Sequence, residues 1–343
     1  MATPSRVFIT GVTGFIGSQV LLDTLEAGHH VRFSVRREAQ IDEVKARYPQ
    51  HVSQLEAVVI PSIESVDALR PALSDDINYV LHIASPMPGK GEDFKTEYLK
   101  PAVDGTEAML NAAKSAPTVK RVVIMSSLLS LMPLGAMAME GLHVRPGENA
   151  NIAVDPDTPF PDGPAGYGIK YSASKILAHR ATIQWVEQHK PHFSVVTVHP
   201  TFVLGRDLTQ RDAASPNGLN AYLLKSLTNP PGGNPVVPAS MVDVRDVSQV
   251  VLRSLGVDLN KEELVTEYLV DGNPTSYDEV VAFVKRKYPE IDVKLEGPFK
   301  RPFTSDTSRT EKELGIQWHG MEEIVSRVLD QQSELGERVK AEL

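Results

Sequence analysis

"RVFITGVTGFIG", residues 6–17, decides the fold, because an apolar strand runs directly into a glycine-rich turn and a helix. A glycine at the first position suits a tight turn, a second lets the backbone approach a phosphate, and a third lets helix and strand pack closely. Unpaired N–H groups at the helix N-terminus then favour an anion. A purely structural turn is the alternative. We predict a dinucleotide site formed by the following residues of the turn: Gly11, Thr13, Gly14, Phe15, Ile16 and Gly17.

Short apolar runs alternate with amphipathic stretches through the first half of the chain. This pattern is typical of βαβ units and predicts an α/β fold, a Rossmann-type doubly wound parallel sheet. After His199 the sequence becomes rich in proline and glycine. We therefore predict an NADP-binding Rossmann domain over 1–200 and, over 201–343, mainly a smaller substrate-binding lobe with some segments returning to the sheet. The predicted strands are 6–10, 30–35, 55–60, 78–83, 121–126 and 193–199.

Composition narrows the classes of function. The formal net charge of −9 provides no basic face for a phosphodiester backbone, so nucleic acid is not an expected partner. The chain has no cysteine, which excludes disulfides, thiolate catalysis and cysteine-ligated metals. No apolar stretch has the length of a signal peptide or membrane span. We expect a cytoplasmic protein without a metal site that acts on a small molecule, as a monomer or homodimer.

The end of the second predicted strand distinguishes between dinucleotides. An acidic residue there favours the free ribose of NAD, but this sequence has Arg36 and Arg37. A guanidinium can bind the 2′-phosphate of NADPH in a bidentate manner and stack on adenine. NADPH is therefore the predicted cofactor, with solvated surface arginines as the alternative.

"GYGIKYSASK", residues 166–175, contains two tyrosine–lysine pairs. Glycines surround Tyr167, which predicts a loop or first-turn position and a poorly fixed relation to Lys170. Tyr171 and Lys175 begin a well-formed helix, and the ammonium is expected to lower the tyrosine pKa, as general acid catalysis requires. An ordinary pair on a helix surface is the alternative.

Ser126 and Ser127 follow the fifth predicted strand, at the edge where open α/β sheets bind ligands. A hydroxyl at this place can donate a hydrogen bond to a substrate carbonyl oxygen. Either serine can also simply cap the end of the strand.

Five motifs in this order resemble the extended short-chain dehydrogenase/reductases: "TGVTGFIG", "LHIASP", "RVVIMSS", "YSASK" and "HPTFVLG". The sequence is most similar to the dihydroflavonol-reductase-like group, which includes yeast-type NADPH-dependent carbonyl and methylglyoxal reductases. The resemblance covers nearly the whole chain. "KPAVDGT" before the fourth helix differs from the sugar-nucleotide epimerases, and no acidic pair follows Ser127 as in the dehydratases.

The resemblance implies roles for individual residues. Ser127, Tyr171 and Lys175 become the catalytic serine, tyrosine and lysine, and Arg36 the ligand of the 2′-phosphate. Where the family has an acidic residue and a leucine near the adenine, this chain has Ser62 and Ile63. The remaining implied cofactor contacts are Ala84, Ser85, Pro86, Pro200, Thr201 and Val203.

We therefore expect NADPH-dependent reduction of a carbonyl compound, with Tyr171 as the proton donor. The methionine-rich segment 128–144 fits a bulky apolar ketone or aldehyde, or else packs under the small lobe. One alternative is a nucleotide-sugar epimerase or dehydratase of the same fold. Another is a binding protein that senses NADPH without chemistry.

Overall fold

The structure, a computed structural model, describes residues 4–74, 76–85, 91–139, 141–228, 235, 239–299 and 303–341. Seven strands form one parallel sheet in the order β10-β7-β5-β4-β1-β2-β3. All six predicted strands are confirmed to within one residue at each end, and β10 is added at the edge. The strands are β1 Arg6–Thr10, β2 His30–Val35, β3 Leu55–Val59, β4 Ile77–His82, β5 Arg121–Met125, β7 Ser194–Pro200 and β10 Thr266–Val270.

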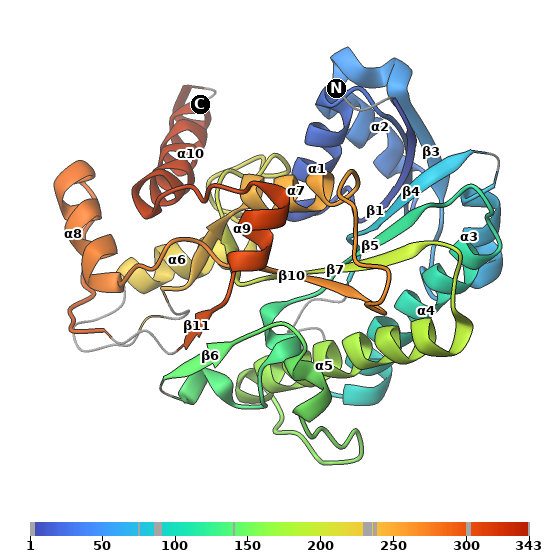
Figure 1. Cartoon of the computed structure of the whole chain (residues 1–343). Helices are drawn as coiled ribbons and strands as arrows, with labels where there is room; N and C mark the ends of the chain where they lie inside the picture. The colour runs from blue at the N-terminus through green and yellow to red at the C-terminus, as the bar shows by residue number, and fades with distance from the viewer. Residues whose placement is uncertain are drawn as a thin grey trace.

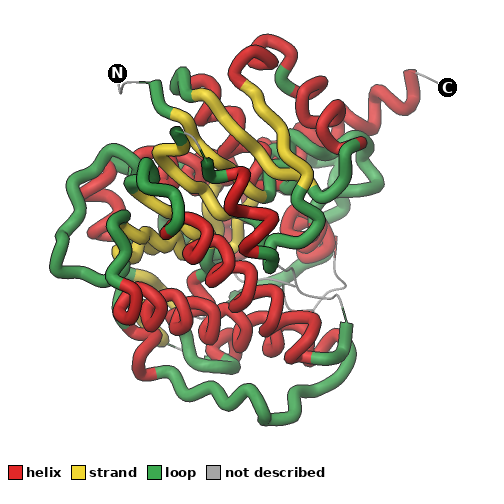
Figure 2. The backbone as a smooth tube through the Cα atoms, turned by 90° about the vertical axis from the view of Figure 1, so that its right-hand side faces the viewer, coloured by secondary structure: helices red, strands yellow, loops and turns green. Residues whose placement is uncertain are grey.

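Helices cover both faces of this sheet (Figures 1 and 2). Alternate strand residues therefore point into two apolar layers, which is why the strands are apolar on both sides. No helix of the described part of the chain is long and apolar enough to span a membrane. One face packs against α1 Phe15–Glu26, α2 Ala39–Arg47 and α7 Val244–Arg253, and the other against α3 Val66–Ala72, α4 Lys100–Lys114 and α5 Pro164–His189.

A smaller lobe has a core of its own. Leu223, Met241, Val280 and Val328 belong to one buried apolar cluster, separate from the two sheet layers. In Figure 1, α6, α8 and α10 lie together beside the sheet. The division at residue 200 stays a prediction, because β10 and α7 return to the sheet. The remaining strands and α-helices are β6 Leu142–Val144, β8 Phe202–Leu204, α6 Gly218–Thr228, β9 Met241–Asp243, α8 Tyr277–Lys287, β11 Phe303–Ser305, α9 Ser308–Leu314 and α10 Met321–Ala341.

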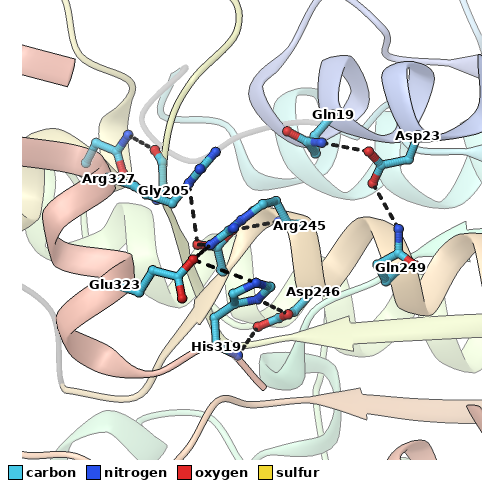
Figure 3. A network of polar contacts seen from close by, with 11 residues as sticks. Gln19, Asp23, Gly205, Arg245, Asp246, Gln249, His319, Glu323 and Arg327 are labelled. Atoms are coloured by element: carbon cyan, nitrogen blue, oxygen red, sulfur yellow. Dashed lines mark hydrogen bonds and ion pairs between the residues drawn. The ribbon is translucent and has the colours of Figure 1, made fainter. Parts of the chain in front are cut away.

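A polar network joins the lobe to the sheet domain through α7 (Figure 3). Arg245 donates to Asp243 at 2.9 Å and to Glu323 of α10 at 2.8 Å. At the next position, the Asp246 carboxylate contacts His319 Nδ1 at 2.5 Å. Gln249, one turn further, donates to Asp23 of α1. Thus α7 contacts both α1, the helix after the glycine turn, and α10, the last helix of the lobe.

Candidate active site

The predicted site residues converge at the carboxyl edge of the parallel sheet. β1 and β4 are neighbours, and the chain leaves them toward opposite sides of the sheet, which creates the switch point where α/β sheets bind ligands. The following predicted residues lie in the segments that follow the strands: Gly11 after β1, Arg36 after β2, Ser62 and Ile63 after β3, Ala84 and Ser85 after β4, Ser127 after β5 and Thr201 after β7.

The glycine turn leaves a helix N-terminus open. Gly11 has φ +81°, and a Cβ there would lie 2.7 Å from the Ala84 nitrogen. A Cβ on Gly17 would lie 2.0 Å from the Gly11 carbonyl oxygen. The N-cap of α1, Gly14, has no side chain, and the first turn has no acidic residue. Backbone N–H groups and the positive end of the helix dipole are thus free for an anionic group such as pyrophosphate.

The end of β2 is exposed and basic. The backbone N–H groups of Arg36 and Arg37 donate to Gln40 Oε1 at 3.1 and 3.2 Å, which fixes the turn into α2. Neither guanidinium forms an ion pair with a described residue. Beyond β3, Ser62 is exposed, and the side chain of Ile63 packs against Gly105 of α4. This rim can accept an adenosine.

The serine, tyrosine and lysine meet at the middle of the edge. The Ser127 side chain lies beside Tyr171 and accepts a hydrogen bond from the Leu129 N–H at 3.3 Å, and Lys175 lies one helical turn beyond Tyr171 on α5. Lys175 Nζ donates to Ser85 Oγ at 2.6 Å, which ties the helix to the segment after β4. Burial lowers the pKa of Lys175 to about 8. Ser85 and Ser127 follow β4 and β5, whereas Tyr171 and Lys175 lie on α5. The fold thus brings together side chains that are up to 90 residues apart in the sequence.

The prediction that Lys175 lowers the tyrosine pKa is wrong. Burial raises the pKa of Tyr171 to about 12, and the hydrogen bond with Ser127 offsets only part of this effect. Lys175 Nζ lies 5.5 Å from the centre of the tyrosine ring and donates to Ser85 instead. Tyr171 therefore keeps its proton at neutral pH, as a proton donor must.

The second tyrosine–lysine pair has a different task. α5 begins at Pro164, so Tyr167 lies in its first turn and the alternative of a loop is wrong. Its hydroxyl donates to Glu92 Oε1 at 3.1 Å, and Lys170 Nζ donates to Glu92 Oε2 at 3.0 Å. Lys170 is 1% exposed. This pair anchors the segment around Glu92 to α5, which sequence spacing did not indicate.

The nicotinamide-side predictions fall on the last strands. Pro200 ends β7, the Thr201 N–H donates to Val270 O at 2.9 Å, and Val203 is a buried residue of β8. Pro86 lies outside the described residues. Five buried residues of the apolar segment 128–144 pack into a core with Leu269 and Phe303, whereas Met137 and Met139 are exposed, so packing accounts for part of the segment.

Sequence reasoning missed a buried cluster behind the site. His179 Nε2 lies 2.7 Å from Glu267 Oε1, and the rings of His179 and His199 meet edge to face at 4.7 Å. A ring nitrogen of each histidine and a carboxylate oxygen of Glu267 all lie within 4.8 Å of one another. His199 also contacts the Ser127 carbonyl oxygen at 3.2 Å, while Thr197 Oγ1 lies 2.8 Å from its Nε2. The signal was the i, i+4, i+8 spacing of Tyr171, Lys175 and His179.

We expect Lys175→Met to raise stability at pH 7. Burial lowers the pKa of Lys175 in the folded protein to about 8, whereas the unfolded chain keeps the ordinary value of 10.5. Below pH 8 the lysine is charged in both states, so the cost of burying the cation is then fully present. Between pH 8 and 10.5 the folded protein loses the proton first and the cost disappears. The gain is at most about 3 kcal/mol, less the lost hydrogen bond to Ser85.

Thermal unfolding from pH 7 to pH 10 measures this gain, which should shrink as the pH rises. Lys170→Met is the matched control on the same helix. Burial lowers the pKa of Lys170, but the Glu92 hydrogen bond and charge outweigh burial and leave it raised. This variant should lose stability at pH 7. A loss of stability in Lys175→Met at pH 7 would contradict the prediction.

Comparisons with known proteins identify the family of this chain. Residues 7–263 match the model of the NAD dependent epimerase/dehydratase family. Ketoreductase sphI of Aspergillus fumigatus is 33% identical over 342 residues, covering 97% of this chain and 99% of that protein. Ketoreductase CTB6 of Cercospora beticola is 28% identical, covering 97% and 96%. Yeast methylglyoxal/isovaleraldehyde reductase Gre2, complexed with NADPH, superposes with a TM-score of 0.81 at 21% identity, covering 96% and 98%. The predicted family resemblance is confirmed, and the chain belongs to the NAD dependent epimerase/dehydratase family.

Proposed function

We propose that the protein reduces a ketone or aldehyde to an alcohol with NADPH. The observation that carries this proposal is the meeting of Ser127, Tyr171 and Lys175 at the carboxyl edge of the sheet, near an open helix N-terminus. The names of the relatives, two ketoreductases and an NADPH-complexed reductase, support the same chemistry.

NADPH, when bound, would supply the hydride, and the side chains of the protein orient the carbonyl group and supply the proton. The Ser127 hydroxyl donates a hydrogen bond to the carbonyl oxygen as negative charge develops there. Tyr171 delivers its proton to that oxygen. We assign Lys175 to the nicotinamide ribose.

The cofactor contacts follow the carboxyl edge. The glycine turn and α1 would hold the pyrophosphate, Arg36 the 2′-phosphate, and Ser62 with Ile63 the adenine. Residues after β4 and β7 would line the nicotinamide. We propose that the substrate binds beside Tyr171, that lobe 201–343 contributes most of its contacts, and that the protein is a cytoplasmic monomer or homodimer. The second group of contacts is Ala84, Ser85, Pro200, Thr201 and Val203.

A bulky apolar substrate fits the surroundings of the proton donor. Tyr171 packs in an apolar cluster with Phe94, Phe160 and Leu134, and the two phenylalanine rings lie 4.5 Å apart. Such a wall favours an apolar group next to the carbonyl. The relatives named as ketoreductases support a ketone over a small aldehyde.

Loss of NADPH absorbance with a panel of ketones and aldehydes tests the proposed function. Steady consumption with an apolar ketone supports it. An epimerase or dehydratase would retain bound nucleotide and consume none in net terms, and a sensor would bind NADPH without turnover. Either of the last two results overturns the proposal.

Replacing Arg36 by alanine should raise the Kd for NADPH about 10-fold or more and leave NADH binding unchanged. The guanidinium is the proposed partner of the 2′-phosphate, and a charge-assisted hydrogen bond contributes roughly 1.5–3 kcal/mol. Fluorescence titration with both nucleotides measures this change. Arg37→Ala, one residue further along the same exposed turn, is the control and should have a smaller effect. Equal losses for both nucleotides would contradict the assignment.

A further inference from the structure

A stripe of polar side chains runs along the sheet-facing side of α5. Lys175, His179 and Thr182 are 5%, 2% and 1% exposed, and they follow Tyr171 at helical spacing. Residues four apart on a helix lie one above the other, with Cβ atoms about 5–6 Å apart. A buried polar side chain is costly unless it has a partner. The stripe therefore needs partners beneath the helix.

A cavity lies beneath this stripe. It has a volume of about 20 Å³, which is room for an ordered water. Lys175 and His179 both line it, and His179 Nδ1 is buried without a hydrogen-bond partner among the described residues. A water in the cavity would satisfy that atom. The other polar lining residues are His82, Ser85, Thr106, Ser126, Thr182 and Thr197.

Glu267 holds the other end of the His179 ring. Because its carboxylate accepts from Nε2, the imidazole carries a hydrogen there and turns Nδ1 away from Glu267. The second carboxylate oxygen accepts from the Gly147 N–H at 2.6 Å. Burial raises the pKa of Glu267, but the hydrogen bond with His179 and the neighbouring histidines outweigh burial and lower it to about 2. Glu267 is thus ionised at neutral pH.

Two further buried histidines, His199 and His82, lie near His179 and the cavity. Burial lowers the pKa of His199, on β7, to about 3. Burial, together with the charge of Lys175, lowers that of His82, on β4, to about 4. Both rings are therefore neutral at physiological pH. Of the described histidines around the cavity, His179 alone is paired with a carboxylate.

We propose that water in this cavity links Lys175 Nζ to His179 Nδ1, and that the His179–Glu267 pair resupplies the proton that Tyr171 gives to the product. The inference rests on the proposed function. Each turnover breaks the Tyr171 O–H bond and forms the O–H bond of the alcohol. The phenolate then takes a proton from the Lys175 ammonium, and Lys175 takes one through water from the His179 imidazolium. His179 is reprotonated from solvent, so no oxidant or reductant is needed beyond the hydride of the main reaction. His179 acts through Lys175 and does not touch the substrate.

A crystal structure of the protein without cofactor gives the first test. It should show an ordered water within hydrogen-bond distance of both Lys175 Nζ and His179 Nδ1. A dry cavity, or a side chain between these two atoms, would overturn the relay whatever the activity of the enzyme.

Rapid mixing of His179→Gln with NADPH and a ketone gives the second test. Glutamine can still donate a hydrogen bond to Glu267 but cannot pass on a proton. Tyr171 and the Lys175 ammonium both carry a proton at the start, so the first two turnovers should proceed at the wild-type rate, with a burst of two NADPH per active site. Steady turnover should then fall about 10-fold or more, with a larger solvent deuterium isotope effect. Glu267→Gln, which removes the charge and keeps a hydrogen-bond acceptor, should give the same burst.

His189→Gln is the matched control. His189 lies on the same helix, where its ring stacks on Trp185 and its Nδ1 donates to the Trp185 carbonyl oxygen. It does not line the cavity, so this variant should show no burst. A merely structural role of His179 would slow the first turnover as much as the later ones, and that result overturns the relay alone. A wild-type protein that oxidises no NADPH with any carbonyl overturns the proposed function and the relay with it.

Discussion

Tyr171→Phe should lower kcat about 1,000-fold while leaving the Kd for NADPH unchanged. Loss of a positioned general acid costs between about 10²- and 10⁴-fold. Burial raises the pKa of Tyr171 to about 12, so the hydroxyl beside Ser127 is protonated throughout the neutral range. Phenylalanine keeps the ring within its apolar cluster and removes only the hydroxyl group.

Steady-state kinetics and fluorescence titration of NADPH together measure this effect. Tyr167→Phe is the matched control, since Tyr167 lies one turn earlier on α5 and its hydroxyl bonds Glu92. This control should keep most of its turnover. Full activity in Tyr171→Phe would remove Tyr171 as the donor, and an equal loss in both variants would indicate damage to the helix instead.

Gly17→Ala should destabilise the fold by at least about 3 kcal/mol and abolish dinucleotide binding. The new Cβ would lie 2.0 Å from the Gly11 carbonyl oxygen and 2.6 Å from the Gly11 carbonyl carbon. Both atoms are backbone, so no side chain can move aside. Either α1 shifts away from β1 or the turn changes shape, and each change displaces the N–H groups proposed to hold pyrophosphate.

Thermal unfolding, compared with that of Gly14→Ala, separates these effects. A Cβ on Gly14 would have its nearest neighbour at 3.5 Å, and Gly14 has φ −99°, so alanine fits without strain. The Gly14 variant should unfold near the wild-type temperature, whereas Gly17→Ala should unfold at least about 5 °C lower. Similar unfolding temperatures for Gly17→Ala and wild type would show that the close packing is not needed.

Much of this architecture could be predicted because the deciding signals are local. The strands of a doubly wound sheet are apolar on both faces, and the glycine turn lies at one strand–helix junction, so short windows of sequence identify both. The exception is β10. Its segment, "TEYLV", begins with Thr266 and Glu267, both of which are buried and polar. Its strand character therefore depends on pairing with β7, which is distant in sequence.

Properties that depend on distant partners could not be predicted. The pKa of Tyr171 follows from how deeply α5 buries the phenol, and the i, i+4 spacing to Lys175 says nothing about that. The hydrogen bond between Lys170 and Glu92 joins residues that are 78 positions apart, and the one between His179 and Glu267 joins residues that are 88 positions apart. In both cases the fold alone brings the two side chains together, because Glu92 lies in the loop before α4 and Glu267 lies on β10, both far from α5 in the sequence.

The return of β10 to the sheet matters for protein engineering. A chimera that joins two relatives at residue 200 would pair β10 of one parent with β7 of the other over five residues, Thr266↔Val196 to Val270↔Pro200. It would also pack α7 of one parent against α1 of the other. Exchange of substrate lobes between relatives therefore requires grafts that leave 244–253 and 266–270 with the dinucleotide-binding parent.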